Sequence, residues 1–159
     1  MTIKNKYSFP RINDLFDQVG EANIFSELKL RSSYHQVRIK NEDINKKTFR
    51  TRYRHYEFVV IPFRLTNATT TFMFLMNTIF SEYLDKFVVV FIDDILVYSK
   101  TKEEHEEHLR ILLQTLMKKK LYANFDNCDF YQKEIQYLGH IISAEGVVVD
   151  LEKKKSIRE

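Results

Sequence analysis

The stretch FVVVFIDDILVYSK, residues 87–100, places two adjacent aspartates inside a run that is otherwise rich in Val, Ile and Phe. The apolar residues on either side predict two β-strands, with Asp93 and Asp94 at the tip of the hairpin that joins them. Burying two neighbouring carboxylates is costly unless a cation or a polar cleft compensates. The pair is therefore the first place to look for chemistry.

The dipeptide alone leaves three interpretations of Asp93 and Asp94 open. They can form a solvated turn, because Asp is common in turns. They can form a single Ca²⁺ or Mg²⁺ site, or they can belong to a two-metal site for phosphoryl transfer. The valine-rich strands on both sides favour the metal interpretations, because a hard divalent ion needs oxygen ligands that are held rigidly.

Helical spacing is found on both sides of this hairpin. Apolar residues recur with a helical period between Asn67 and Tyr83, at positions 72, 75, 76, 79 and 80. After the hairpin, Ser99 or Thr101 is expected to cap a long amphipathic helix that runs to residue 120. Acids fill the first turns of that helix and lysines fill the last, as the helix macrodipole favours. A short helix is also predicted near residues 13–19, with Asn13 as its N-cap.

The remaining segments predict strands. IFSELKL (24–30) alternates apolar and polar residues, YHQVRIK (34–40) continues in extended form, and KTFRTRYRHYEFVVIPF (47–63) is expected to form a hairpin. LYANF, CDFY, IQYLGHIIS and GVVVD close the chain as short strands between residues 121 and 150. These elements together indicate the α+β class, with antiparallel strands and two helices packed on one face.

Composition places the chain in a broad class. A length of 159 residues suits one domain, and 44% hydrophobic with 30% charged residues is an ordinary globular balance. The net charge of +3 is compatible with a polyanionic partner. A single cysteine, Cys128, excludes an internal disulfide and a cysteine-based zinc site, and is expected to be a small buried hydrophobe in a reducing compartment. No membrane-length apolar run is present, so we expect a soluble intracellular domain in the cytoplasm or the nucleus.

Several motifs, in order and with matching spacing, carry a resemblance to a known family. They are LRSSYHQVRIK (30–40), FRTRYRHYEFVVIPF (49–63), LTNATTTF (65–72), LDKFVVVFIDD (84–94), FIDDILVYSKTKEEHEEHLRILLQTL (91–116) and YLGHIISAEGV (137–147). The chain resembles reverse transcriptases of Ty3/gypsy-type long-terminal-repeat retrotransposons, especially plant elements. The resemblance implies a polymerase palm, which is a ferredoxin-like antiparallel sheet with two helices on one face, plus part of the fingers. Residues 1–159 are then expected to be a single domain fragment, without thumb, connection and RNase H regions.

The resemblance also implies a function and a site. The family is an RNA-directed DNA polymerase that binds a template–primer and deoxynucleoside triphosphates, and three aspartates hold its two Mg²⁺ ions. Other parts of a retrotransposon polyprotein are expected partners, and a membrane is not. Asp93 and Asp94 match the catalytic pair. By the same resemblance, we expect the nucleotide to be contacted by Tyr34, Phe63 and Arg64. The residues expected to contact nucleic acid are Arg50, Arg52, Tyr53, Arg54, Leu138 and Gly139.

The chain departs from the family pattern at the third carboxylate. The family places Asp-Leu before its Arg-Ser-Gly-Tyr-His-Gln motif, whereas this chain has Lys29 at the aspartate position. Glu27 lies on the same strand face but about 6.6 Å along the strand, too far for metal-ligand geometry. Arg64 replaces a glycine, and Asn127 replaces a lysine that is a candidate general acid. We therefore expect nucleotidyl transfer to be absent or severely reduced. The alternatives are a non-catalytic nucleic-acid-binding remnant and a product without a role.

Three further features have an ordinary and a functional interpretation. His105 and His108 have the spacing of a metal pair, but the four glutamates around them are more typical of a solvated helix face. The aromatic and basic stretch FRTRYRHYEF (49–58) is the best candidate for nucleic-acid contact, or else a solvated hairpin with aromatic cross-strand pairs. The lysines at 118–120 complement a helix C-terminus first and contact phosphate second.

Overall fold

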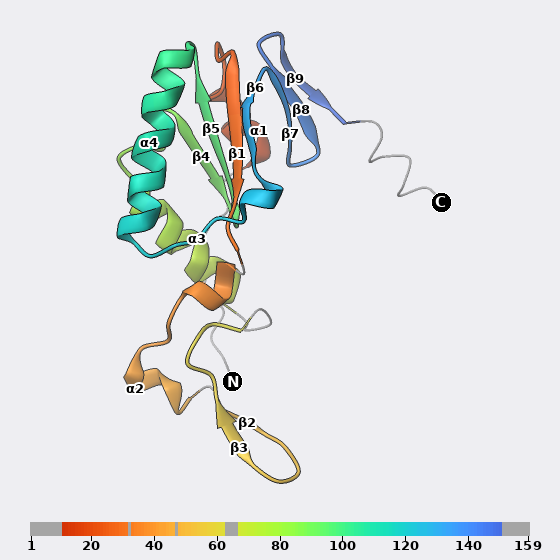
Figure 1. Ribbon diagram of the computed structural model, residues 1–159. Coiled ribbons are helices and arrows are strands. Elements are labelled where there is room, and N and C mark those ends of the chain that lie inside the picture. The colour runs from red at the N-terminus through yellow and green to blue at the C-terminus, as the bar shows by residue number, and fades with distance from the viewer. Residues whose placement is uncertain (1–10, 32, 47, 63–66, 151–159) are drawn as a thin grey trace.

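A four-stranded antiparallel sheet forms the centre of the computed structural model, which describes residues 11–31, 33–46, 48–62 and 67–150 (Figure 1). The strand order is β4-β5-β1-β6, with β4 at Val88–Phe91, β5 at Asp94–Ser99, β1 at Ile24–Lys29 and β6 at Asp129–Gln132. The predicted hairpin of residues 87–99 is confirmed as β4 and β5. No helix in the described ranges combines the length and the apolar character that crossing a membrane requires.

Two helices cover one face of this sheet, as the sequence predicts. They are α3 (Ala68–Ile79) and α4 (Lys102–Lys118). Side chains at alternate strand positions, such as Leu28, Ile95 and Val97, form one buried core with Phe72 of α3 and Leu112 of α4. Burial of these apolar side chains is the main force that holds the helices against the sheet.

The opposite face of the sheet is covered by α1 (Ile12–Asp17) and by a second, three-stranded sheet. That sheet contains β7 (Glu134–Tyr137), β8 (His140–Ser143) and β9 (Gly146–Val149). Phe25 and Leu96 pack there with Leu15, Tyr137 and other apolar residues in a second core. β9 is the outer strand of its sheet, and its three valines at 147–149 are 38–64% exposed.

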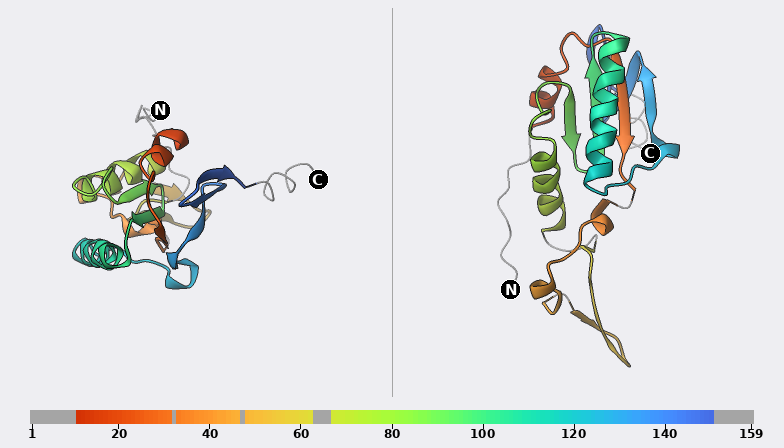
Figure 2. Two further views of the ribbon diagram at one scale, coloured as in Figure 1. Left: turned by 90° about the horizontal axis from the view of Figure 1, so that it is seen from above. Right: turned by 60° about the vertical axis from the view of Figure 1, so that its left-hand side comes forward.

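A narrow extension leaves one end of the body and carries a small hairpin at its far end (Figures 1 and 2). It contains the 3-10 helix η1 (Ser33–Gln36), α2 (Asn41–Ile44), β2 (Thr48–Arg50) and β3 (His55–Glu57). The predicted hairpin is confirmed. The prediction of an extended segment over 34–40 is wrong at its start, because the Gln36 amide bonds to the backbone of Tyr122, and η1 forms there instead.

Helix capping confirms one further prediction and contradicts another. Thr101 caps α4 through a complete capping box with Glu104, as the sequence indicates. Asn13 does not cap α1, since the helix begins one residue earlier and Arg11 makes no side-chain cap. Residues 121–125 do not form a strand either. They contribute one isolated bridge, Leu30 with Ala123, and lead into the 3-10 helix η2 (Phe125–Asn127).

Candidate active site

The two aspartates lie where β4 turns into β5. Phe91 pairs with Asp94 across the hairpin, so Ile92 and Asp93 form a two-residue turn. Ile92 has a φ of +56°, which is unusual for a β-branched residue and costs conformational energy. Its backbone N–H lies 2.8 Å from Sδ of Met73 on α3, which ties the turn to the helix layer. Both carboxylates are partly buried at a strained but anchored turn.

Lys29 lies directly opposite Asp94, because these two residues pair in the antiparallel register of β1 and β5. The backbone of Lys29 is fixed on its other side as well. Its N–H lies 3.4 Å from Sγ of Cys128, and its carbonyl accepts a 2.7 Å hydrogen bond from the backbone N–H of Asn124. Since side chains alternate along a strand, Glu27, Lys29 and Asp94 share the sheet face that points away from α3 and α4.

The structure shows an ion pair between Lys29 and Glu27. The Lys29 Nζ lies 3.6 Å from Oε2 of Glu27, a residue that is 4% exposed. Burial raises the pKa of Glu27. The positive charge of Lys29 lowers this pKa in part, and the negative charge of Asp94 raises it further. Glu27, which the sequence reasoning weighed only as a distant substitute ligand, is therefore the direct partner of the cation.

These residues do not fit a site for two divalent ions. An ammonium stands at the position where the resemblance places the third carboxylate, and it already engages the nearest remaining acid. Within the described ranges, no three His, Cys, Asp or Glu side chains converge closely enough to hold a metal. At 4 Å, repulsion between unit charges is about 4 kcal/mol at an effective dielectric constant of 20, and about twice that for a divalent ion.

The turn between β7 and β8 approaches the same acids. The Tyr137 hydroxyl lies 3.2 Å from the backbone oxygen of Asp94 and donates a hydrogen bond to it. Burial raises the pKa of Tyr137 well above its usual value, and the charges of Asp94, Glu27 and Asp93 add to this effect. Leu138 and Gly139 follow with φ values of 50° and 75°, the conformation of a tight two-residue hairpin turn. The Tyr137 hydrogen bond thus links the strand that precedes this turn to the backbone of β5 at Asp94.

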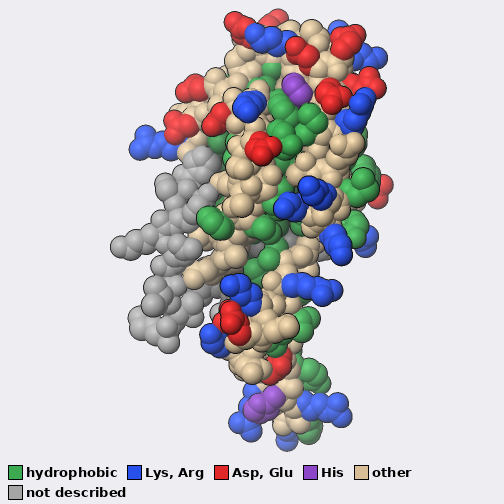
Figure 3. All heavy atoms as spheres, turned by 90° about the vertical axis from the view of Figure 1, so that its left-hand side faces the viewer, with side chains coloured by type: hydrophobic (Ala, Val, Ile, Leu, Met, Phe, Trp, Pro, Cys, Tyr) green, Lys and Arg blue, Asp and Glu red, His purple; other side chains and the backbone are tan. Residues whose placement is uncertain are grey.

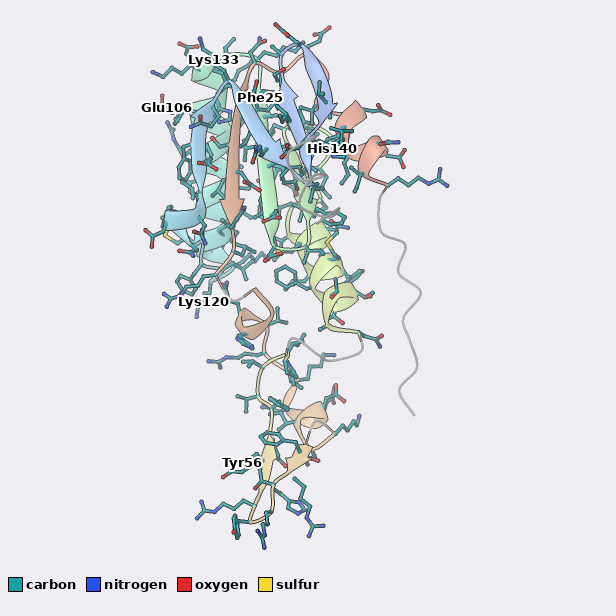
Figure 4. All side chains as sticks on the ribbon, turned by 90° about the vertical axis from the view of Figure 1, so that its right-hand side faces the viewer. Phe25, Tyr56, Glu106, Lys120, Lys133 and His140 are labelled. Carbon is teal, nitrogen blue, oxygen red and sulfur yellow. The ribbon has the colours of Figure 1, made fainter. Side chains whose placement is uncertain are left out.

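The β2–β3 hairpin is exposed and lies at the far end of the extension, as the label on Tyr56 shows in Figure 4. Phe49 and Tyr56 stack across its two strands with ring centroids 5.4 Å apart. The predicted contact residues Arg50, Arg52, Tyr53 and Arg54 are all exposed, and the guanidinium carbon of Arg52 lies 5.7 Å from the ring centroid of Tyr53. The structure does not bring this hairpin to Asp93 and Asp94.

The predicted nucleotide contacts are placed only in part. The backbone of Tyr34 belongs to η1, which follows β1 and lies beyond the Lys29 end of the sheet. Phe63 and Arg64 fall outside the described residues. Asn127, where the family pattern has a lysine, belongs to η2 and is exposed.

The solvated-face prediction is wrong for His105, which is fully buried. Its Nε2 lies 2.7 Å from Oγ of Ser26, and its Nδ1 lies 2.8 Å from Oγ of Ser99. The same Ser99 oxygen lies 2.7 Å from Nδ1 of His108. Burial, with the neighbouring His108, lowers the pKa of His105 to about 4. The sequence did contain a sign of this burial. His105 is spaced four and seven positions from the buried Leu109 and Leu112, so it continues the apolar stripe of α4.

Cys128 is partly buried against the first core, and its Sγ also lies 3.1 Å from the backbone oxygen of Asn124. It is therefore less buried than predicted, and its contacts help to position the Lys29 backbone.

Comparisons with known proteins identify the family and the fold. The family model described as reverse transcriptase (RNA-dependent DNA polymerase) matches residues 1–142. An RNA-directed DNA polymerase homolog of Oenothera berteroana is 52% identical over 118 residues, which cover 72% of this chain and 83% of that relative. The Pol polyprotein of the Drosophila melanogaster transposon opus is 36% identical over 159 residues, and this chain spans 16% of it.

Solved structures show the same fold. Foamy viral protease-reverse transcriptase in complex with RNA/DNA hybrid matches 99% of this chain with a TM-score of 0.85, at 15% sequence identity. A form of that protein in complex with double-stranded DNA matches with a TM-score of 0.87. This chain covers 21% and 27% of those two chains.

Proposed function

The chain belongs to the reverse transcriptase family, and from that premise we propose that this palm binds nucleic acid but has lost most or all nucleotidyl transfer. Its fold is that of a reverse transcriptase palm with part of the fingers. Family members generally use divalent metal ions. The observation that carries the proposal is the position of Lys29, which lies opposite Asp94 and forms an ion pair with Glu27.

Lys29 opposes catalysis by charge rather than by bulk. An aspartate at this position would add an anion to the face that Asp94 occupies, and the lysine adds a cation instead. The local charge therefore differs by two units, and the resulting repulsion acts on any divalent ion placed beside Asp93 and Asp94. Magnesium ions and deoxynucleoside triphosphates are accordingly expected to bind poorly here, although both would be ligands of an intact relative.

Nucleic-acid binding rests on two surfaces that Lys29 does not alter. The β2–β3 hairpin presents exposed arginines and stacked aromatic rings, a combination suited to phosphates and bases. The Leu138–Gly139 turn follows Tyr137, whose hydroxyl donates a hydrogen bond to the backbone oxygen of Asp94. A template–primer is the proposed partner, because the foamy viral relative was solved with RNA/DNA hybrid and with double-stranded DNA.

Primer extension tests the loss of transfer. The unmodified chain and Lys29→Asp are compared on one primer–template with Mg²⁺ or Mn²⁺, and Lys29→Asp/Arg64→Gly is included because Arg64 also departs from the family pattern. We expect no extension by the unmodified chain, but binding to the primer–template in a salt-dependent gel shift. An Asp93→Asn/Asp94→Asn variant sets the background, and extension by the unmodified chain equal to that of Lys29→Asp and above this background would contradict the proposal.

Binding is tested separately with Arg50→Gln/Arg52→Gln in the hairpin. We expect this variant to lose affinity for the primer–template, and its slope of log affinity against log salt to fall by about 1.8 for duplex DNA. If the unmodified chain does not bind the primer–template at all, the product without a role becomes the better interpretation.

A further inference from the structure

A hollow of the body lies away from the aspartates, on the face that α3 and α4 cover. Its volume is about 1060 Å³, and it opens between the C-terminal halves of these two helices, the end of η1 and the residues that follow η1. Leu75 and Ile79 of α3 and Thr115 of α4 contribute to its wall. Glu27, Lys29 and Asp94 occupy the opposite sheet face, so this cleft is separate from the candidate active site.

Positive charge dominates the cleft. Its lining contains Arg38, Lys118, Lys119 and Lys120, against a single carboxylate, Glu82. The excess of three positive charges equals the net charge of the entire chain, +3. In Figure 3, Lys and Arg side chains recur along a basic band on this face, from the β2–β3 hairpin at the bottom to the middle of the body, with a few acids among them, while most acids lie towards the top.

The helix macrodipole does not account for all of this charge. One or two cations in the last turn of α4 would satisfy it, and its effect is confined to that turn. Lys119 and Lys120 follow the end of the helix, and Arg38 comes from a different segment across the cleft. Lys120 also has a φ of +56°, at a helix end where glycine is usual, so a lysine is placed there at a conformational cost.

An exposed aromatic ring lies beside these cations. Tyr122 lines the cleft and is 64% exposed, while its backbone is held in place. The backbone N–H of Tyr122 donates a 2.6 Å hydrogen bond to Oε1 of Gln36, and its carbonyl accepts a 2.8 Å bond from the N–H of Arg31. These hydrogen bonds use only the backbone of Tyr122, so its exposed ring is available to stack on a base.

We propose that this cleft, between α3 and the end of α4, is a second nucleic-acid site that holds single-stranded nucleic acid, with the lysines on phosphates and Tyr122 on a base. A positively charged groove with an aromatic platform is the arrangement by which proteins hold single strands without sequence preference. The site lies at the waist of the molecule, where the label on Lys120 stands in Figure 4, between the body and the extension. A strand in the cleft would continue along the basic band towards the hairpin.

The test compares two pairs of lysines in the full chain, with fluorescence anisotropy of a labelled oligothymidylate over a salt series. Lys119→Gln/Lys120→Gln removes two cleft charges at exposed positions beyond α4. Lys102→Gln/Lys133→Gln removes the same charge at exposed positions near the opposite end of the body, where Figure 4 labels Lys133. We expect the cleft pair to reduce the slope of log affinity against log salt by about 1.4, and the control pair to leave it unchanged.

A second pair of variants addresses stacking without changing charge. Tyr122→Ala is expected to weaken oligothymidylate binding by about five-fold or more, and Tyr122→Phe to restore it, because the phenylalanine ring also stacks. Arg50→Gln/Arg52→Gln removes charge from the hairpin alone, so failure of the hairpin site and failure of the cleft site are distinguishable.

Three results would overturn the proposal. The cleft pair can bind the oligonucleotide as the unmodified chain does, or the control pair can lose as much affinity as the cleft pair. The third result is that the unmodified chain sediments as a homodimer and the cleft pair does not, while both bind the oligonucleotide equally. The basic cleft would then bind the acidic first turns of α4 in a second copy of the chain.

Discussion

Glu27 and Lys29 lie on one side of β1, so a change of either residue alters the electrostatics around Asp94. The partly exposed ammonium of Lys29 acts as an internal counter-ion for a carboxylate that is almost fully buried. An ammonium and a divalent ion cannot both act as counter-ion to the same carboxylate, because two positive charges about 4 Å apart repel strongly.

Replacing Lys29 with aspartate is therefore expected to make stability depend on magnesium. Without the ion, Lys29→Asp should lower the free energy of unfolding by about 1 kcal/mol, since the partly exposed pair with Glu27 is lost and an acid is added. With saturating Mg²⁺ the variant should regain about 1 kcal/mol, or about 2–4 °C in Tm. Thermal unfolding with and without Mg²⁺ measures both effects.

Lys29→Asn is the matched control, because it removes the ammonium without adding a carboxylate. It should show the loss in stability but not the recovery with Mg²⁺. An equal rise in Tm for the unmodified chain would show that Lys29 does not keep magnesium away.

His105 predicts an acid-sensitive stability. Its pKa in the folded chain is about 4, below the value of 6.5 expected when unfolded, so the unfolded state takes up the proton more readily. The stabilising contribution is present above pH 6.5 and is lost as pH falls towards 4, by about 3 kcal/mol in total. The groups that face the ring are Ser26, Ser99, His108 and the ring of Tyr131.

Chemical denaturation between pH 4 and pH 7 tests this expectation. His105→Gln should flatten the pH dependence of the free energy of unfolding, whereas His55→Gln, in the exposed hairpin, should leave it unchanged. A slope that persists in His105→Gln would assign the acid sensitivity to other groups.

At the level of single elements, α4 depends on its first turn. Thr101 and Glu104 exchange side-chain and backbone hydrogen bonds there, which satisfies donors that the helix itself cannot. Thr101→Ala should lower the free energy of unfolding by about 1 kcal/mol, and Thr101→Ser should not. Urea denaturation measures the difference, and equal losses for both variants would show that the cap oxygen is not the cause.

The elements that sequence patterns predicted well have strong local signals. Periodic apolar residues located α3 and α4, and the alternation in residues 24–30 located β1. The predictions failed where distant residues decide the conformation. Gln36 bonds to Tyr122, 86 positions away, and this long-range contact replaces a strand with a 3-10 turn.

The candidate site shows the same division. The turn at Ile92 and Asp93 follows from the apolar strands on both sides of it, which are visible in the sequence. The pairing of Lys29 with Asp94 joins strands that are far apart in the chain, and the family resemblance rather than a local pattern related these two residues. The partner of Lys29 was not visible, because the choice between Glu27 and the aspartates depends on side-chain geometry. The burial of His105 required knowledge that Ser26 of β1 lies beneath α4.

Considered as a whole, the described residues form a central four-stranded sheet with a core on each face, and a thin extension that contributes little to either core. Segments on both sides of the extension supply strands to that sheet, since β1 precedes it and β4, β5 and β6 follow it. The fold of the body therefore does not require an unbroken chain through the hairpin.

Limited proteolysis tests this organisation. Trypsin should cut early at the exposed Arg50, Arg52 or Arg54, and the two pieces should stay together in size-exclusion chromatography, because they share the sheet. Separation of the pieces without denaturant would show that the hairpin is needed to hold the body together.

The outer strand β9 has a consequence for handling the protein. Its outer edge pairs with no strand in the part of the chain that the structure describes, and Val147, Val148 and Val149 expose apolar surface, so we expect two molecules to add their strands edge to edge. Purified chain should then form higher-order species that scatter light as concentration rises, and a charged residue at the most exposed valine, Val148→Lys, should suppress them. The limit on preparing this palm in isolation would thus be its colloidal behaviour rather than the strength of its two cores.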